Sequence, residues 1–273
     1  MNINIYQIFY DDNSKNVLDH GFIPLDNSKN LRPDWYELHP IREFFLRESL
    51  VEEDWYGFFS PKFSHKTGLD SSQVKEFIEY SEGKADVALI SYAWDQIAYF
   101  KNPFEQGEKW HPGITDACQS IVKYLNYDID LRTTVYHSGN FTFCNYIVAK
   151  PKYWREWLGM ADKLYSMSEK DGGEIYNFLS IGMKRGSIHN GAPMKAFIQE
   201  RLPFLLILKN GFRTSVYDEG ASAPIFAKLF SNDSNTRTNL QACDLLKGKY
   251  LASGDYRYFE EFLNRRKLIA LRF

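Results

Sequence analysis

The feature that most constrains the fold is a regular alternation of short apolar segments with longer segments of helical spacing. The segment 85–90 is almost continuously apolar, as expected of a strand that helices cover on both faces. On both sides of this segment, apolar residues recur at helical spacing. Trp35, Leu38 and Ile41 are one example. Such alternation predicts an α/β fold with a mainly parallel, Rossmann-like sheet flanked by helices.

The same patterns place the individual elements. Strands are expected at 3–9, 56–60, 85–90, 141–149 and 212–217. Helices are expected at 35–50, 71–80, 115–125, 151–164, 193–208, 236–251 and 255–263. Asp70 has the side chain to cap the second of these helices, and Pro203 should kink or tighten the fifth. Since no segment resembles a linker, we expect one domain over 1–273, with an α/β core (1–210) and a mostly helical C-terminal cap (211–273).

Charge and cysteine usage exclude several classes of protein. Lys plus Arg number 33 and Asp plus Glu 35, so the net charge of −2 argues against a general nucleic-acid-binding protein. The three cysteines, Cys118, Cys144 and Cys243, are too scattered for a disulfide framework or a paired metal site. A reducing compartment follows, and the absence of a signal-like N-terminus and of an 18-residue apolar run predicts a cytoplasmic location.

The common phosphate-binding and hydrolase motifs are missing. The sequence has no G-x-G-x-x-G after a strand, no G-x-x-x-x-G-K-[ST], no G-x-S-x-G and no H-E-x-x-H. This argues against dinucleotide oxidoreductases, P-loop NTPases, α/β-hydrolases and zincins. The aromatic content of 16% supplies core residues, and it also supplies faces for stacking on sugars or bases.

Two basic side chains follow a predicted strand. Lys62 and Lys66 come after the segment 56–60, where open α/β sheets bind ligands. They could offset the charge of a diphosphate, or they could be solvated loop lysines.

The strongest local signal is a pair of charges inside an apolar segment. Glu200 and Arg201 interrupt the helix expected at 193–208. An arginine in such surroundings needs a carboxylate or phosphate partner, and a carboxylate beside apolar groups can act as a base. A structural ion pair is the equally weighted alternative.

Weaker candidates lie elsewhere. Asp128 and Asp130 form the one Asp-x-Asp sequence, which could hold Mg²⁺ or Mn²⁺ or simply cap a loop. His111 lies in a polar segment expected to be a loop, 105–113, and could transfer a proton or bind a sugar hydroxyl. Asn145 sits inside an expected strand, where it bonds either a neighbouring strand or a ligand.

Several of these segments resemble bacterial capsular-polysaccharide glycosyltransferase domains. The segment 143–151 with the aromatic helix of Trp154 and Trp157 resembles the Asn-x-apolar-x-apolar-Lys strand and following helix of that family. The segment 197–202 resembles its Ser/Ala-Glu-Arg-Leu helix, and 106–111 followed by Asp116 resembles one of its loops. The start of the chain, with strand 6–9 and segment 22–27, is also similar, so the resemblance extends over most of 1–210.

The resemblance implies a GT-A-like nucleotide-diphospho-sugar transferase that builds capsule or lipopolysaccharide. The donor would be a nucleotide sugar, and the acceptor a glycan or lipid-linked glycan at the inner face of the cell membrane. The missing strand-end Asp-x-Asp departs from the metal-dependent pattern and leaves the use of Mg²⁺ or Mn²⁺ open. Asp26, Asn27 and Arg32 are expected to hold the base and ribose, and Lys62 with Lys66 or Arg201 the diphosphate. Asn145 and His111 would orient sugar hydroxyls. Glu200 would act as the base of an inverting displacement, or as a positioning group if the transfer retains configuration.

Two alternatives belong to other classes. A non-catalytic carbohydrate-binding protein would bind sugars but not nucleotides. A DNA-base glycosyltransferase of the phage type would share the donor site but needs a basic surface for the duplex. The segment 265–272, with Arg265, Arg266, Lys267 and Arg272, is the basic stretch that could serve it, or that could contact an anionic membrane.

Overall fold

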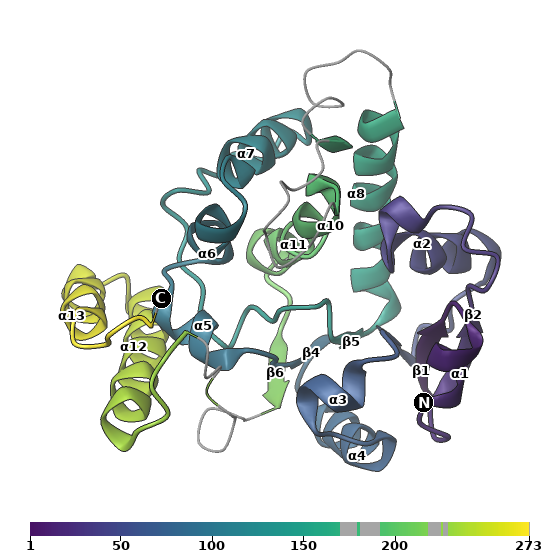
Figure 1. Ribbon diagram of the computed structural model, residues 1–273, viewed down its shortest axis with the longest axis horizontal. Coiled ribbons are helices and arrows are strands. Elements are labelled where there is room, and N and C mark those ends of the chain that lie inside the picture. Colours follow the sequence, from purple (N-terminus) through teal and green to yellow (C-terminus); the bar gives the residue numbers. More distant parts are fainter. Residues whose placement is uncertain (170–178, 181–191, 218–224, 226–228, 273) are drawn as a thin grey trace.

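A six-stranded sheet crosses the centre of the protein, in the order β2-β1-β3-β5-β4-β6 (Figure 1). Five strands run parallel to one another, and β5 runs antiparallel to both of its neighbours, β3 and β4. The predicted α/β class, with a mostly parallel sheet flanked by helices, is therefore confirmed. The computed structural model describes residues 1–169, 179–180, 192–217, 225 and 229–272.

The elements follow the chain in this order: β1 (Ile3–Phe9), α1 (Asp12–Asn16), β2 (Ile23–Asp26), the 3-10 helix η1 (Pro33–Trp35), α2 (Leu38–Arg47), β3 (Trp55–Phe59), α3 (Phe63–Thr67), α4 (Ser71–Ser81), β4 (Val87–Ile90), α5 (Trp94–Tyr99), α6 (Pro103–Trp110), α7 (Ile114–Tyr124), β5 (Ile147–Ala149), α8 (Pro151–Glu169), α10 (Met194–Ile198), α11 (Pro203–Asn210), β6 (Thr214–Tyr217), α12 (Ser234–Ser253) and α13 (Tyr256–Arg266).

Strand side chains alternate between two apolar layers. Tyr56 and Phe58 of β3 face a large core that α2, α7, α8 and α11 complete. Trp55 and Phe59 of the same strand face a smaller core with residues of α3 and α4. The two-residue period of a strand produces this alternation, and helices on both faces explain why β3 and β4 are buried throughout.

Local capping chemistry sets the start of α4 as predicted. The Asp70 carboxylate accepts hydrogen bonds from the backbone N–H groups of Ser72 and Gln73, both at 2.9 Å. Gln73 returns a bond by accepting the N–H of Asp70 at 3.1 Å, which completes a capping box. Buried residues of this helix pack with residues of β3 and β4 in the smaller core.

Two local predictions in the first half of the chain were wrong, and one strand was missed. The strand expected at 141–149 is confined to Ile147–Ala149, because Cys144 and Asn145 take left-handed backbone conformations with φ of 63° and 54°. The segment 105–113, expected to be a loop, is mostly helix α6, which Asn102 caps. The short edge strand β2 was not predicted; it contains Pro24, and most of its side chains are exposed.

The expected helix 193–208 is in fact two helices. The first ends at Ile198 and the second begins at Pro203. Glu200 and Arg201 therefore lie in the turn between α10 and α11 and do not interrupt a continuous helix. Proline cannot supply the backbone N–H that a continuous helix needs at this point, which explains the break.

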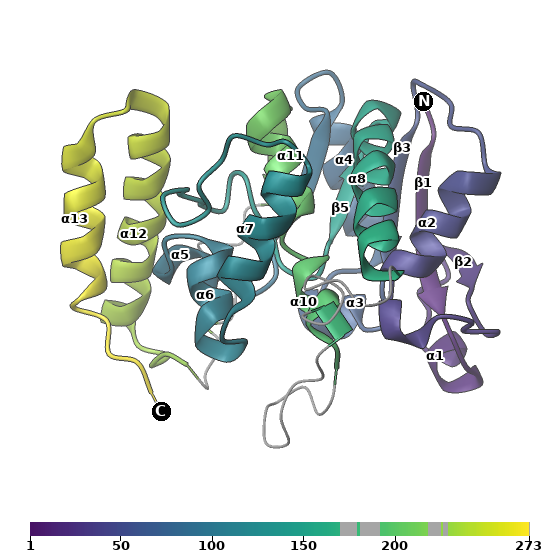
Figure 2. The same ribbon diagram turned by 90° about the horizontal axis from the view of Figure 1, so that it is seen from above.

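The C-terminal helices α12 and α13 form a hairpin at one end of the molecule (Figure 2). The hairpin packs on α5, where the fully buried ammonium of Lys247 donates hydrogen bonds to the carbonyls of Ile97 and Phe100. Asp244 accepts two more bonds from the backbone and hydroxyl of Ser138. Ahead of the hairpin, β6 pairs with β4, so residues beyond 210 also complete the sheet.

The stability of this hairpin should depend on pH through Lys247. Burial lowers the pKa of its ammonium to about 8, although the charges of Asp244, Cys243 and Glu105 oppose the shift. Between that value and the ordinary lysine pKa of about 10.4 the unfolded chain binds more protons, so stability should rise with pH. We expect a gain on the order of 2–3 kcal/mol over this window.

The measurement is urea unfolding of the wild type and of Lys247→Met across the alkaline range. The variant should lose most of this slope. Lys249→Met, on an exposed position of the same helix, should keep it. An equal slope in Lys247→Met and the wild type would contradict the assignment.

Candidate functional site

The strand order places a ligand-binding position at the carboxyl ends of β1 and β3. The chain leaves β1 for β2 on one side and then crosses to β3 on the other. Open α/β sheets bind ligands where the direction of winding reverses in this way. The segments that follow β3 and β4, together with the segment that precedes β5, bring their side chains to this edge.

Lys66 is the cation at this edge. The one-turn helix α3 turns it inward, and its ammonium donates a hydrogen bond to the Cys144 thiol, with Nζ and Sγ 3.1 Å apart. The ammonium also lies 5.3 Å from the ring centroid of Tyr92 and 5.9 Å from that of Tyr146. A thiol is a weak acceptor, and no carboxylate among the described residues forms an ion pair with Lys66. The two N–H groups of the ammonium that do not point to the thiol therefore have no acceptor among the described residues.

The charge of Lys66 is nevertheless retained. Burial disfavours the ammonium, but Cys144, Tyr146 and Glu200 together raise its pKa above the ordinary value. Burial also raises the pKa of the Cys144 thiol to about 12 and that of the Tyr146 phenol above its usual range. Glu200 is the one carboxyl among these three neighbours, and its charge favours the protonated form of Lys66.

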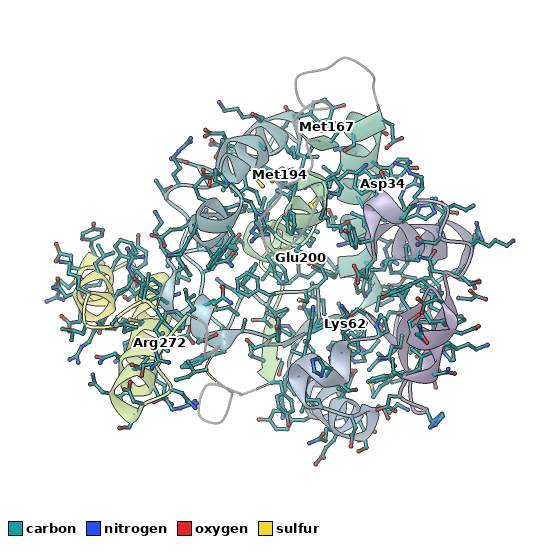
Figure 3. The ribbon with its side chains drawn as sticks, viewed as in Figure 1. Asp34, Lys62, Met167, Met194, Glu200 and Arg272 are labelled. Carbon is teal, nitrogen blue, oxygen red and sulfur yellow. The ribbon has the colours of Figure 1, made fainter. Side chains whose placement is uncertain are left out.

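Glu200 supplies the opposite charge from the turn between α10 and α11. Figure 3 labels it near the centre of the molecule, between the helices and the sheet. Burial raises the pKa of its carboxyl, as does the charge of Glu37, while Arg201 and Lys66 oppose the shift. Its carboxylate accepts no hydrogen bond and forms no ion pair within the part of the chain that the structure describes. A carboxyl in these surroundings is available to accept a proton from a ligand.

Backbone strain gathers around this pair. Tyr36, Ala93, Cys144 and Asn145 all have φ between 48° and 63°, a region that non-glycine residues rarely adopt. Tyr36 precedes Glu37, Ala93 follows β4, and Cys144 and Asn145 precede β5. Each such backbone conformation costs about 1–3 kcal/mol. Strain of this kind is concentrated at functional sites, where surrounding structure holds it in place.

Unpaired polar atoms lie in the same segments. Within the described residues, four buried side-chain oxygens have no hydrogen-bond partner, and three of them lie in these segments: Ser91 Oγ, Asn145 Oδ1 and Gln199 Oε1. Ser91 follows β4, Asn145 precedes β5, and Gln199 precedes Glu200. Asn145 Nδ2 donates to the Gln199 carbonyl at 3.4 Å, which links the two segments. Buried polar atoms without partners are rare, and a ligand or water is the usual explanation.

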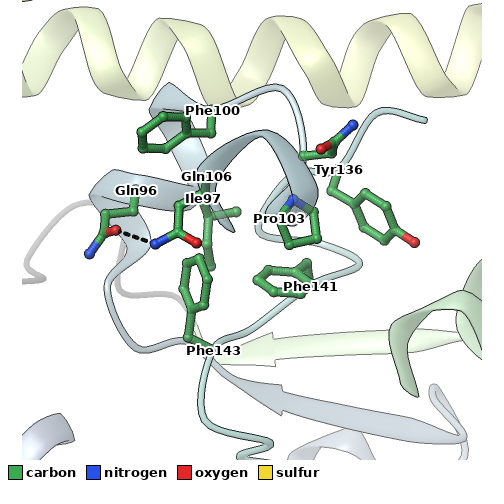
Figure 4. Close-up of a pocket in the computed structure, with 9 residues that line it drawn as sticks. Gln96, Ile97, Phe100, Pro103, Gln106, Tyr136, Phe141 and Phe143 are labelled. Carbon is green, nitrogen blue, oxygen red and sulfur yellow. Dashed lines mark hydrogen bonds between the residues drawn. The ribbon is translucent and has the colours of Figure 1, made fainter. Parts of the chain in front are cut away.

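Arg201 turns away from the ligand position. It is 3% exposed, and its guanidinium donates to the carbonyls of Pro103 and Phe197 and to Gln106 Oε1, at 2.9, 2.7 and 2.7 Å. Gln106 in turn donates to Gln96 beside a cavity of about 10 Å³, a volume suited to one water molecule (Figure 4). Arg201 thus ties α6 to the turn that carries Glu200, and each of its three guanidinium nitrogens donates to a protein acceptor.

The residues expected to hold base and ribose lie at the end of β2 and in the segment after it, and no contact joins them to Lys66 or Glu200 within the described residues. Asp26 is exposed and accepts the Ser28 N–H at 2.7 Å, while the N–H of Asn27 donates to the Phe9 carbonyl. Arg32 is engaged by Asp34 at 2.8 Å and by Glu169 at 2.7 Å. Its donors stabilise the packing of η1 against the end of α8.

Lys62 and His111 are placed differently from each other. Lys62 is the exposed residue that immediately precedes α3, and Figure 3 labels it near the start of that helix. His111 is 3% exposed, and its ring stacks on Phe197 with centroids 3.8 Å apart. Phe197 is three residues before Glu200, so His111 supports the wall behind the carboxyl.

The Asp-x-Asp pair does not fit a metal site. Asp128 and Asp130 are exposed after α7, and Asp130 Oδ1 accepts the Arg132 N–H at 2.9 Å, which closes a turn. Within the described residues, no group of three or more His, Cys, Asp and Glu side chains could hold a metal ion. The Asp130 carboxylate acts as a loop cap.

The basic C-terminal segment is largely engaged within the molecule. Arg266 pairs with Glu105 at 2.9 Å, Arg265 with Glu261 at 3.1 Å, and Arg272 donates to Ser231. In the described part of the chain, no helix has the length and apolar character needed to cross a membrane.

Sequence patterns did not point to Tyr92, Cys144, Glu37 or Gln199. Each belongs to a different segment, and long-range folding alone brings them to one edge of the sheet. The run of positive-φ residues could not be predicted either, since none of them is glycine.

Comparison with known proteins gives no match: no family model, no curated protein and no solved structure matches this chain.

Proposed function

We propose that this protein is a glycosyltransferase that moves a sugar from a nucleotide-diphospho-sugar donor to a glycan or lipid-linked glycan acceptor. One observation carries the proposal: the inward-facing ammonium of Lys66 and the Glu200 carboxyl, which has no hydrogen bond within the described residues, influence each other's charge near the carboxyl edge of a mostly parallel sheet. Sugar transfer needs one group to stabilise the departing diphosphate and another to accept the acceptor's proton.

Lys66 suits the first task. Its N–H groups not used by Cys144 can donate to the oxygens of a diphosphate, where negative charge grows as the sugar leaves. The rings of Tyr92 and Tyr146 restrict its movement and exclude water from its flanks. Lys62, four residues earlier and exposed, could contact a more distant part of the donor.

Glu200 suits the second task. In an inverting transfer, the acceptor oxygen forms a bond to the anomeric carbon while the bond from that carbon to the diphosphate oxygen breaks. The acceptor's proton passes to the Glu200 carboxylate. A pKa raised by burial makes this carboxylate a stronger base than an exposed glutamate. Asn145 and Gln199, whose side-chain oxygens have no hydrogen-bond partner among the described residues, can accept hydrogen bonds from sugar hydroxyls.

The role in surface-polysaccharide synthesis belongs to the same proposal. The acceptor would then be reached on the cytoplasmic side of the membrane. A DNA-base acceptor is less well supported, because the cations Arg265 and Arg266 already pair with Glu261 and Glu105. Steeply salt-dependent binding of duplex DNA would instead favour that alternative.

The experiment is thermal unfolding with UDP-, GDP-, dTDP-, CMP- and ADP-sugars, each with Mn²⁺ and with EDTA. A donor at about 100 times its Kd should stabilise the protein by about 2.7 kcal/mol. For a chain of this size we expect the unfolding temperature to rise by about 5–10 °C with one nucleotide class. Persistence of the shift in EDTA would support Lys66 as the group that holds the diphosphate.

A matched pair of variants tests the position of the site. Lys66→Met should abolish most of the shift, and Lys62→Met should reduce it less, because Lys62 is exposed. No shift with any donor, together with a shift with free sugars, would favour a non-catalytic carbohydrate-binding protein and contradict the proposal.

A further inference from the structure

Lys66 and Cys144 form a contact between a lysine and a cysteine that are 78 positions apart in the chain. The amine nitrogen and the thiol sulfur are 3.1 Å apart, and the thiol accepts the one hydrogen bond that the Lys66 ammonium forms with the described residues. Neither side chain can easily move away. Two aromatic rings flank the ammonium, and left-handed backbone at Cys144 and Asn145 fixes the sulfur.

The other two cysteines lack these surroundings. Cys118 and Cys243 are fully buried, and neither forms a hydrogen bond with a lysine in the described structure. Cys144 is partly exposed, so small oxidants can reach it from solvent. The three thiols of this chain thus provide one candidate for oxidation beside an amine and two internal controls.

We propose that the Lys66–Cys144 pair is a redox modification site, at which dioxygen links the two side chains through a single oxygen atom as N–O–S. Such a bond would hold α3, at the end of β3, to the segment that precedes β5. Thiol reductants would reverse it, because they attack the sulfur and release the amine.

The reaction balances with dioxygen as the oxidant. The Cys144 thiol loses its proton and the Lys66 ammonium loses two. Sulfur and nitrogen are each oxidised by two electrons, and dioxygen is reduced by four. Its O=O bond breaks; one oxygen atom forms the S–O and O–N bonds, and the other leaves as water. Two of the three protons enter that water, and the third is released to solvent.

The protonation states of the Cys144 thiol and the Lys66 amine set the rate of cross-linking. The thiolate and the free amine are the reactive forms, and both are scarce at pH 7 because the pKa of each group is raised. Cross-linking should therefore be slow at neutral pH and faster in alkaline buffer.

The consequence for ligand binding rests on the proposed function. The link would remove the charge and two N–H groups of Lys66, which are the features assigned to diphosphate binding. Oxidation would then switch off donor binding, and reduction would restore it.

The experiment is mass spectrometry of the folded protein after incubation in air-saturated and in anaerobic alkaline buffer. The aerated protein should gain one oxygen atom and lose two hydrogen atoms. Proteolysis should yield one linked pair of peptides, containing Lys66 and Cys144, that dithiothreitol separates. The anaerobic sample of the same protein is the control that requires no variant.

Variants then identify the atoms. Lys66→Arg and Cys144→Ser should lose the linked pair entirely, while Cys118→Ser and Cys243→Ser should retain it, with folding checked by circular dichroism. Absence of the link in aerated wild-type protein, or its persistence in Lys66→Arg, would overturn the inference. Donor binding without a link would overturn this inference alone, and a link without donor binding would overturn the proposed function alone.

Discussion

Replacement of Glu200 by Gln should lower the rate of sugar transfer by about 10²–10⁴-fold, the usual contribution of a positioned general base. Glutamine keeps the size of the side chain but cannot accept the acceptor's proton. Donor binding should change little, because Lys66 rather than Glu200 holds the diphosphate. The measurement is single-turnover transfer with the donor that stabilises the protein in the thermal assay, at saturating donor.

The pH profile gives a second readout of the same residue. The base acts in its ionised form, so kcat/KM should rise with pH through the pKa of Glu200. Burial and the charge of Glu37 raise that pKa above its ordinary value of 4.5. Glu37→Gln removes one of these causes and should move the acid limb to lower pH, whereas a merely structural Glu37 would leave the limb in place.

The control for these variants is Glu79→Gln, an exposed carboxylate on α4 that lies away from the carboxyl edge of the strands. Its transfer rate should match that of the wild type. Full turnover by Glu200→Gln would remove Glu200 from the role of base, and the predicted effect of Glu37→Gln on the pH profile would fail with it.

The sequence was informative where local chemistry determines structure. The strand at Ile3–Phe9, the buried strands β3 and β4 and the Asp70 cap follow from apolar patterning and from one carboxylate at a helix start. These features depend on neighbours within a few residues. The mostly parallel sheet follows from their alternation with helices.

Local patterns failed where tertiary contacts override them. The apolar segment 141–146 has the composition of a strand, but positive φ at Cys144 and Asn145 ends the pairing there. Helix α6 contains Gly107 and several polar residues, which resembles a loop until Asn102 is recognised as its cap. No local pattern indicates the end of pairing at Cys144, whereas Asn102 and Pro103 mark the start of α6 within the sequence itself.

The candidate site shows the same division. Lys62 and Lys66 were equal candidates from their position after β3, and the single turn of α3 separates them by exposing Lys62 and turning Lys66 inward. Glu200 was selected as a charge in apolar surroundings, and burial does raise its pKa. The Cys144 thiol beside Lys66 could not be selected, since 78 positions separate the pair in the chain.

Arg201 was selected by the same reasoning as Glu200, but its contacts assign it to the stability of the fold. Replacement by Met should lower the free energy of unfolding by about 3–5 kcal/mol, because two backbone carbonyls and Gln106 Oε1 would lose their charged donor in the interior. Urea unfolding measures the change. Arg155→Met removes an exposed pair with Glu52 and should cost less than about 1 kcal/mol.

A milder variant keeps the prediction testable if Arg201→Met does not fold. Gly107 lies against the guanidinium, and a Cβ there would meet Arg201 Nε at 2.9 Å and Ile114 Cγ2 at 3.0 Å. Gly107→Ala should therefore displace Arg201 and destabilise the protein, although alanine favours helix more than glycine does. Unchanged stability in both variants would mean that the arginine's interior hydrogen bonds do not hold α6 to the turn of Glu200. Arg201 would then be free to turn toward the diphosphate, which would return it to the set of donor-binding residues.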